Sequence, residues 1–146
     1  MNFFDSLAIS ASALTAERQR TEIIAANLAN AETTHTQAGG PFKRREVVFQ
    51  TEGGSPFGLS LASARSGEVA GEVRVAEVVD DPAPPVMRYE PGHPDANKQG
   101  YVAYPAINPA MEMVDLMDAA RAYQLNASAV AATKQMIQQT IEVLKS

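Results

Sequence analysis

Few side chains of this 146-residue chain could carry acid–base, metal or nucleophilic chemistry. It has two histidines, His35 and His93, and no cysteine. Zinc hydrolysis would need two or three ligands at short, directed spacing, such as histidines at i and i+4, and the sequence does not provide that spacing. The lack of cysteine excludes a disulfide, a thiol nucleophile and a thiolate metal ligand. The sequence therefore predicts no metal and no cofactor.

The pair His93 and Asp95 could orient an imidazole as a general base, as in a small hydrolase. The pair lies in the turn-forming run Pro-Gly-His-Pro-Asp, where a surface or hydrogen-bonded structural histidine is far more common. Asp80 and Asp81 stand directly before Pro82, and turn capping accounts for both carboxylates. The glycine pairs of the chain lack the lysine and the strand–loop–helix order of a phosphate cradle. We therefore expect no catalytic residue and no enzyme.

The elements that hold these residues are marked by glycine and proline. All nine glycines and all nine prolines lie between Gly39 and Pro109. Inside a helix glycine costs about 1 kcal/mol and proline about 3, so residues 1–38 and 110–146 are free to form long helices. The sequence predicts a mainly helical α+β fold, in which the terminal helices pair as a coiled-coil-like hairpin with a small β-rich insertion between them.

The N-terminal helix is predicted from an apolar stripe that runs from about Phe3 to Ala31. Asn27 and Asn30 interrupt it near its end. Asparagine lowers helix propensity, and a buried amide needs hydrogen-bond partners. We expect a buried asparagine here to fix the register of an assembling helix rather than to add stability. The residues of this helix expected at an assembly interface are Leu7, Leu14, Ile24, Asn27, Leu28 and Asn30.

The C-terminal helix carries the clearer repeat. The residues Leu116, Tyr123, Val130, Ile137 and Leu144 recur at heptad spacing and are expected at the same interface. The companion positions are filled by Met113, Ala120, Ala127 and Ile141, with Lys134 as the polar exception. The stripe is rich in alanine, so an isolated two-helix hairpin would bury little area, and neighbouring copies could supply the missing burial. The methionines near the stripe are expected in the core.

The middle of the chain is predicted to hold short strands and turns. Alternating apolar residues predict strands at 43–51, 71–79 and 86–89, with a loop at 53–67. Residues 89–109 are rich in tyrosine and proline, which predicts a stiff connector into the C-terminal helix. The residues that define this connector are Tyr89, Pro91, Gly92, His93, Pro94, Asp95, Gly100, Tyr101, Tyr104, Pro105, Asn108 and Pro109.

These elements divide the chain into three expected parts. The helical core comprises residues 1–34 and 110–146, and the β-rich outer module comprises residues 35–88. The connector at 89–109 joins the module to the second core helix. The chain has no internal repeat, and its length suits one domain or a helical pair with a small insertion.

Charge and hydropathy exclude two classes of partner. The formal net charge is -5 and is spread thinly, so no nucleic acid is expected, because phosphate neutralisation needs a basic stripe. The basic run Lys43-Arg44-Arg45 is followed at once by Glu46 and suits a solvated strand edge. No apolar run approaches the roughly 20 residues of a membrane helix, so no direct membrane insertion is expected. The N-terminus lacks the basic head and apolar core of a cleavable signal peptide.

Four segments resemble the flagellar rod and hook axial proteins. AANLANAETT at residues 25–34 is similar to the end of the N-terminal helix of that wider family. YEPGHPDANKQGYVAYPAINP at residues 89–109 resembles the more discriminating signature of proximal-rod members. MVDLMDAARAYQLNASAVAATKQM at 113–136 resembles the C-terminal helix, and GGPFKRREVVF at 39–49 an early strand. The resemblance covers nearly the whole chain and is weakest at residues 50–70.

The resemblance implies a structural subunit of the bacterial flagellar basal-body rod, in its proximal part. Such a subunit assembles through its terminal helices into the drive shaft that transmits torque and forms part of the export channel. Its implied neighbours are copies of itself, other proximal-rod and distal-rod proteins, the hook–basal-body adaptor protein and the MS-ring. It would reach the periplasmic space through the flagellar type III export apparatus without a cleaved signal peptide. Helices that stay partly disordered before assembly would suit this route.

An alternative is an adaptor or chaperone of a secretion system, in which a helical hairpin offers its apolar stripe to varied clients. This alternative leaves the tyrosine- and proline-rich segment 89–109 without an explanation. The structural subunit and the adaptor are both non-enzymatic, so they differ in what the helices bind rather than in any reaction.

Overall fold

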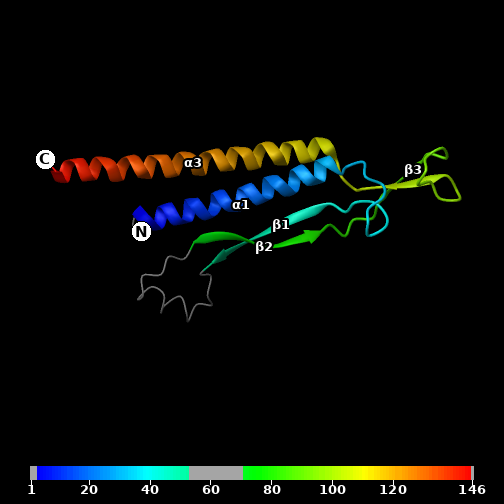
Figure 1. Ribbon diagram of the computed structural model, residues 1–146, viewed down its shortest axis with the longest axis horizontal. Helices are drawn as coiled ribbons and strands as arrows, with labels where there is room; N and C mark the ends of the chain where they lie inside the picture. The colour runs from blue at the N-terminus through cyan, green and yellow to red at the C-terminus, as the bar shows by residue number, and fades with distance from the viewer. Residues whose placement is uncertain (1–2, 53–70, 146) are drawn as a thin grey trace. The chain divides into compact units, whose positions relative to one another are not determined.

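The computed structural model describes residues 3–52 and 71–145. The elements in chain order are α1 (Phe3–Ala29), β1 (Arg45–Glu52), β2 (Glu72–Asp80), β3 (Val86–Tyr89), β4 (Tyr101–Tyr104) and α3 (Pro109–Lys145) (Figure 1). A long helix near each end, with small two-stranded sheets between them, confirms the expected α+β class. The pairing of the helices as a coiled-coil-like hairpin stays a prediction, and the loop expected at 53–67 lies outside the described residues.

The helix α1 ends at Ala29, short of the predicted end at Ala31, because Asn30 caps it. The Asn30 Nδ2 donates to the carbonyl oxygen of Ala26 at 2.8 Å, and the Asn30 Oδ1 accepts from the Thr33 hydroxyl at 3.1 Å. Such side-chain bonds satisfy groups that the end of a helix leaves unpaired and compete with a further turn. Asn30 therefore terminates the helix.

The helix α3 begins at Pro109 on a capping asparagine. The Asn108 Oδ1 accepts from the backbone N–H of Ala110 at 3.0 Å, and the Asn108 carbonyl oxygen accepts from the Glu112 N–H at 3.0 Å. Proline in the first helical position loses no hydrogen bond, because that N–H has no partner inside the helix. The helix then runs to Lys145 with no further proline and no glycine.

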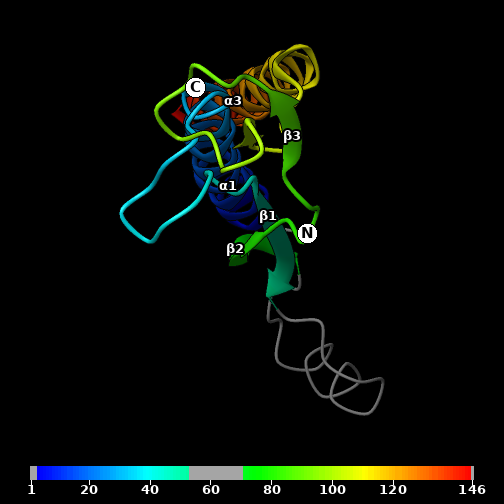
Figure 2. The same cartoon turned by 90° about the vertical axis from the view of Figure 1, so that its right-hand side faces the viewer.

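The strands β1 and β2 form a two-stranded ribbon, which can be followed in Figure 2. The Asp81 N–H donates to the Arg44 carbonyl oxygen at 2.7 Å, which places the start of β1 beside the end of β2. The strands predicted at 43–51 and 71–79 are confirmed, with slightly shifted ends. A two-stranded ribbon is marginally stable alone in water, so these strands need support from another element.

The strands β3 and β4 form an antiparallel hairpin, of which the sequence predicted only the first strand. The strand β4 lies within the segment that was expected to be a connector. The register pairs Val86 with Tyr104, Met87 with Ala103, Arg88 with Val102 and Tyr89 with Tyr101. The Glu90 N–H donates to the Gly100 carbonyl oxygen at 2.9 Å where the loop closes. The rings of Tyr89 and Tyr101 meet edge to face at 5.3 Å.

Backbone contacts divide the chain into two compact units. The first comprises residues 1–19, 48–77 and 119–146, and the second comprises residues 20–47 and 78–118. Each helix and each strand of the β1–β2 ribbon contributes to both units, whereas the β3–β4 hairpin belongs to the second alone.

In the first unit α1 supports β2 through Ser12. The Ser12 Oγ accepts from the Val73 N–H at 3.0 Å and donates to the Ile9 carbonyl oxygen at 2.8 Å. A β-carbon added to Gly71 would lie 3.4 Å from the Ile9 side chain, so the backbone passes close to the helix there. The helix α1 therefore supplies the support that this end of the ribbon requires.

The second unit contains a small core that is partly polar. Ile24, Asn27, Val102, Tyr104 and Glu112 are each 9 % exposed or less. A buried amide and a buried carboxylate are costly unless their polar atoms have hydrogen-bond partners. The stability of this unit therefore depends on the bonds that Asn27 and Glu112 make.

Candidate assembly interface

Asn27 is 1 % exposed and makes three hydrogen bonds. Its Nδ2 donates to the Arg45 carbonyl oxygen at 2.9 Å and to the Glu112 Oε2 at 3.1 Å. Its Oδ1 accepts from the Arg45 N–H at 2.9 Å. The amide thus pairs with both backbone groups of Arg45, as a neighbouring strand would, and both of its N–H donors are used. Asn27 joins the last turns of α1 to the first residue of β1.

Glu112 brings the first turn of α3 to the same point. It is 1 % exposed, and its two carboxylate oxygens accept from Asn27 and, at 2.6 Å, from the Arg44 Nε. A hydrogen bond between an arginine and a carboxylate is stronger than a neutral one, and a negative charge in the first turn of a helix is favoured by the helix dipole. The burial of this carboxylate is therefore compensated.

Arg44 is surrounded by carboxylates. Besides Glu112, its guanidinium contacts Glu46, and its second terminal nitrogen lies 3.5 Å from the Asp115 Oδ2. Partial burial acts to lower the pKa of Arg44, but the hydrogen bonds and charges of Glu112 and Glu46 outweigh it and raise that pKa. Asn27, Arg44, Glu112 and the backbone of Arg45 are called the junction cluster below.

The junction cluster is suited to fastening rather than to catalysis. An amide, a guanidinium and a carboxylate that are paired with one another offer no free nucleophile or base. Among the described residues, no three histidine, aspartate or glutamate side chains are grouped to hold a metal ion. What the arrangement does is to hold together three segments that are distant in sequence.

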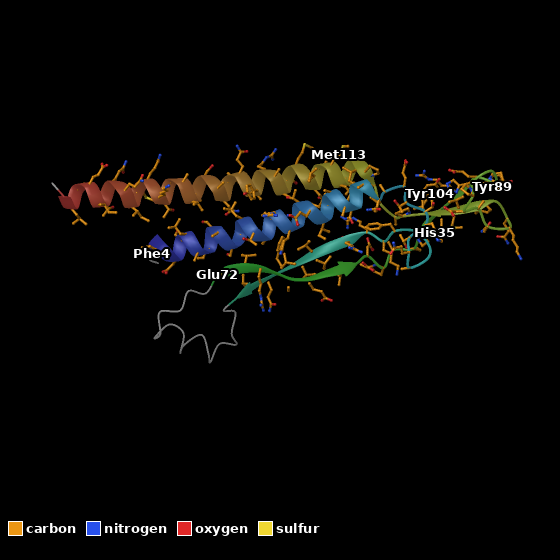
Figure 3. All side chains as sticks on the ribbon, viewed as in Figure 1. Phe4, His35, Glu72, Tyr89, Tyr104 and Met113 are labelled. Carbon is orange, nitrogen blue, oxygen red and sulfur yellow. The ribbon has the colours of Figure 1, made fainter. Side chains whose placement is uncertain are left out.

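The residues His93 and Asp95, considered for a hydrolase, are occupied in a turn. The His93 Nδ1 accepts from the Asp95 N–H at 3.1 Å and lies 4.0 Å from the Asp95 Oδ2. That oxygen instead accepts from the Thr34 hydroxyl at 2.7 Å. The carboxylate is therefore engaged by Thr34 and does not orient the imidazole as a base. His35, the other histidine, which is labelled in Figure 3, is exposed.

Tyr104 gives the second unit a pH-dependent hydrogen bond. Its hydroxyl donates to the Glu90 Oε2 at 2.9 Å, and this bond, with burial, raises the pKa of Tyr104 above its ordinary value of 10.0. The folded state thus keeps the phenol protonated where the unfolded chain has begun to lose that proton. Its stabilising contribution is complete below pH 10.0 and is lost as the pH rises through the raised folded-state pKa.

We expect Tyr104→Phe to weaken this alkaline sensitivity. The denaturant midpoint of the native chain should fall more steeply above pH 10.0 than the midpoint of the variant, because only the native chain carries the shifted group. Tyr123→Phe, at an exposed tyrosine of α3, is the matched control and should keep the native slope. Equal slopes in the native chain and in Tyr104→Phe would contradict this prediction.

The residues expected at the interface are covered to different degrees in the single chain. On α1, Ile24 and Asn27 are buried, whereas Leu7, Leu14, Leu28 and Asn30 are half-buried. On α3, Leu116, Val130 and Ile137 are half-buried, whereas Tyr123 is 44 % exposed and Leu144 is 81 % exposed. Whether these residues form an interface between subunits stays a prediction.

The buried positions beside the main heptad of α3 differ from the companion positions that the sequence predicts. Glu112, Ala119 and Thr133 are buried and Asn126 is half-buried, and each lies one position before an expected companion. A search for apolar repeats misses these four residues because three of them are polar. Asn126 and Thr133 donate to the carbonyl oxygens four residues earlier, which satisfies their polar atoms beside the helix. The sequence signal that could have indicated this buried face is a heptad repeat of small and polar residues.

The helix α3 exposes large apolar side chains on several sides. They are Met111, Met113, Val114, Met117, Tyr123, Leu125, Met136, Ile141, Val143 and Leu144. Met113, which projects from the helix in Figure 3, is 53 % exposed. The expectation that the methionines belong to the core is therefore wrong for the single chain. A helix that is apolar on more than one side is typical of one that is covered on more than one side.

The part of α3 at residues 122–133 lacks charge, since Arg121 and Lys134 flank twelve uncharged residues. Alanine and serine make up much of this stretch and allow close approach of another helix. Within the described residues, neither helix combines the length and apolar character that a membrane span requires.

Known proteins resemble this chain over nearly its whole length. A family described as flagella basal body rod protein matches residues 7–34, and one described as flagellar basal body rod FlgEFG protein C-terminal matches residues 98–143. The "Flagellar basal-body rod protein FlgC" of Bacillus subtilis is 40 % identical over 151 residues, which cover 99 % of this chain and 100 % of that protein. Proteins of the same description from Borreliella burgdorferi and Escherichia coli O157:H7 are 33 % and 38 % identical. They cover 99 % and 97 % of this chain, and 99 % and 95 % of their own lengths.

Proposed function

The chain belongs to the FlgC family of flagellar basal-body rod proteins and is a structural, non-enzymatic subunit of the rod, and we propose that it occupies the proximal rod. In this proposal the terminal helices pack against those of neighbouring subunits and line the shaft that transmits torque. The neighbours are copies of this chain, other proximal-rod and distal-rod proteins, the hook–basal-body adaptor protein and the MS-ring. The subunit reaches the periplasmic space through the flagellar type III export apparatus without a cleaved signal peptide.

The observation that supports this proposal is the apolar exposure of α3. Leu125, Met117 and Val114 are each more than half exposed although they are large and apolar. Each buried Å² of apolar surface contributes roughly 25 cal/mol, so covering such a helix on several sides would stabilise an assembly considerably. A shaft needs many interfaces that are modest individually and rigid together, and close-packed small residues supply that rigidity.

The proposed division of labour follows the three expected parts. The helical core at residues 1–34 and 110–146 is assigned to the axis of the rod, and the module at 35–88 to its outer side. The segment 89–109 joins the two. A helical-hairpin adaptor or chaperone is set aside, because the nearly full-length relatives are described as rod proteins.

The proposal is tested by Leu125→Glu. Leu125 is 67 % exposed, so a glutamate there should leave the unfolding of the purified chain within about 0.5 kcal/mol of the native value. It should, however, abolish swimming and remove the chain from isolated basal bodies, because an unpaired charge buried between helices is costly. Gln50→Glu, which adds the same charge at an exposed position of β1, should swim normally.

The decisive measurement is the amount of the variant chain in isolated basal bodies, rather than motility alone. Basal bodies that contain normal amounts of the Leu125→Glu chain would show that this side of α3 is not covered in the rod. A loss of both folding and incorporation would mean that Leu125 matters to the single chain, contrary to its exposure.

A further inference from the structure

We propose that Met113 and Met117 form an oxidant-sensitive site on the free subunit. A peroxide converts their thioethers to sulfoxides, which leaves the chain folded but keeps it out of the rod, and methionine sulfoxide reductases reverse the change. This inference rests on the proposed function, because incorporation into the rod is the step that the sulfoxides would block. The two side chains are called the methionine pair below.

The first support is the exposure of the methionine side chains. Methionine is one of the residue types most often buried in proteins. In the described part of this chain, however, all five methionines are between 46 % and 63 % exposed, and the methionine pair is 53 % and 59 % exposed. Oxidation of methionine requires that the oxidant reach the sulfur, so a small peroxide has access to the pair in the free subunit.

The second support is the side of α3 on which the pair lies. Met113 and Met117 are four residues apart, so they are neighbours on one side of the helix. Glu112, which lies in the same turn but on another side, is 1 % exposed and belongs to the junction cluster. The cluster thus fastens the covered side of this turn, while Met113 projects from the helix (Figure 3). The pair is therefore exposed on a helix whose other side is held in place.

The proposed modification is a two-electron oxidation of each thioether. The sulfur lone pair attacks one oxygen of hydrogen peroxide, and the O–O bond breaks as the S–O bond forms. The transferred oxygen loses its proton to the departing hydroxide, which leaves as water. The reverse step uses two thiols, which form a disulfide while the sulfoxide oxygen leaves as water, and separate reductases act on the two sulfoxide epimers. The oxidation therefore turns a flexible apolar side chain into a polar one that can be repaired.

The consequence of a sulfoxide depends on what covers it. In the free subunit the new oxygen lies in water, so the stability of the chain should change little. In the rod, the proposed packing of α3 against neighbouring subunits would bury this oxygen, and a buried polar group without a hydrogen-bond partner is costly. Oxidation is therefore expected to act on assembly and not on folding. Once a subunit is incorporated, the same packing should shield its sulfurs from the oxidant.

Peroxide treatment of the purified full-length chain tests whether the site is open. Peptide mass mapping should show that Met113 and Met117 oxidise within about tenfold of the rate of free methionine, because both are exposed. The denaturant midpoint of the oxidised chain should equal that of the untreated chain, and the reductases with a dithiol should restore the original mass. Slower oxidation of both side chains, or unfolding of the oxidised chain, would overturn the proposal.

The sulfoxide content of assembled and unassembled subunits tests the effect on assembly. In cells that lack the reductases and grow in sublethal peroxide, sulfoxide at Met113 and Met117 should be at least about tenfold rarer in basal bodies than in the unassembled chain. Met87 is the matched control, because it is 51 % exposed on β3, in the module assigned to the outer side of the rod. Its sulfoxide should be equally frequent in both pools. Equal frequencies at the methionine pair, or equal depletion at all three residues, would overturn the proposal.

Two double variants separate the polarity of the sulfoxide from its shape. Met113→Gln/Met117→Gln places uncharged polar groups of similar length at both positions, and it should fold but be at least about tenfold less abundant in basal bodies. Met113→Leu/Met117→Leu stays apolar, cannot form a sulfoxide and should be incorporated normally. Normal incorporation of the glutamine variant, or loss of the leucine variant, would contradict the proposal. Incorporation of Leu125→Glu bears only on the proposed function, so the two can fail separately.

Discussion

Replacing Asn27 with aspartate is expected to destabilise the purified chain by about 3–5 kcal/mol, the range found when a buried charge loses its partner. The change keeps the acceptor for the Arg45 N–H but turns the Nδ2 donor into an oxygen. That oxygen would face the Arg45 carbonyl, now at 2.9 Å from Nδ2, and the Glu112 carboxylate, now at 3.1 Å. Chemical denaturation measures the loss, which is a large share of the 5–15 kcal/mol typical of native proteins.

Asn97→Asp is the matched control for this prediction. The Asn97 Oδ1 accepts from the N–H groups of Gln99 and Tyr101, each at 2.9 Å, and Asn97 is exposed. Aspartate supplies the same acceptors, so the change should cost less than about 0.5 kcal/mol. A similar small loss in Asn27→Asp would mean that the amide donors of Asn27 contribute little. The swimming of cells that carry Asn27→Asp should fall with the folded fraction of the chain.

Gly100→Ala is expected to destabilise the β3–β4 hairpin by about 2–3 kcal/mol. Gly100 has a φ of +82°, where an L-residue costs roughly 1–2 kcal/mol. A β-carbon there would also lie 2.8 Å from the Tyr89 Cε2 and 3.2 Å from the Pro91 Cβ. The Tyr89 ring would have to leave its edge contact with Tyr101. Hydrogen exchange of the β3 and β4 amides and chemical denaturation would both report the loss.

Gly92→Ala in the same loop provides the comparison. No atom lies within 4 Å of a β-carbon added to Gly92, and its φ is not positive. Alanine there should be neutral or slightly stabilising, because it reduces the freedom of the unfolded chain. Comparable losses in Gly92→Ala and Gly100→Ala would show that the loop tolerates neither change and would remove the steric explanation.

Both predictions concern contacts that cannot be predicted from the neighbouring residues in the sequence. Asn27 and Asn30 look alike in the sequence, but one fastens three segments and the other ends a helix. The reason is that the amide at position 27 meets the backbone of Arg45 and the Glu112 carboxylate, whereas the amide at position 30 donates to the Ala26 carbonyl of its own helix. The environment, and not the residue type, distinguishes the two.

The strand β4 is a second feature that the local sequence does not predict. Its sequence, Tyr101–Tyr104, is short and lies among prolines, and the sequence alone predicts a stiff connector there. Pairing with β3 across the loop 90–100 makes it a strand, and Val102 in it is 0 % exposed. A four-residue strand is decided by its partner, because its own propensity is too small to fix a structure.

The sequence by itself determined what depends on local chemistry. The exclusion of glycine and proline from the ends predicted both long helices, alternation predicted β1, β2 and β3, and the segments 25–34 and 89–109 indicated the family. Only the tertiary structure decided which face of α3 is covered and that Asn27, Arg44 and Glu112 meet. Propensity acts between neighbours in sequence, whereas a bond across 85 residues depends on the path of the whole chain.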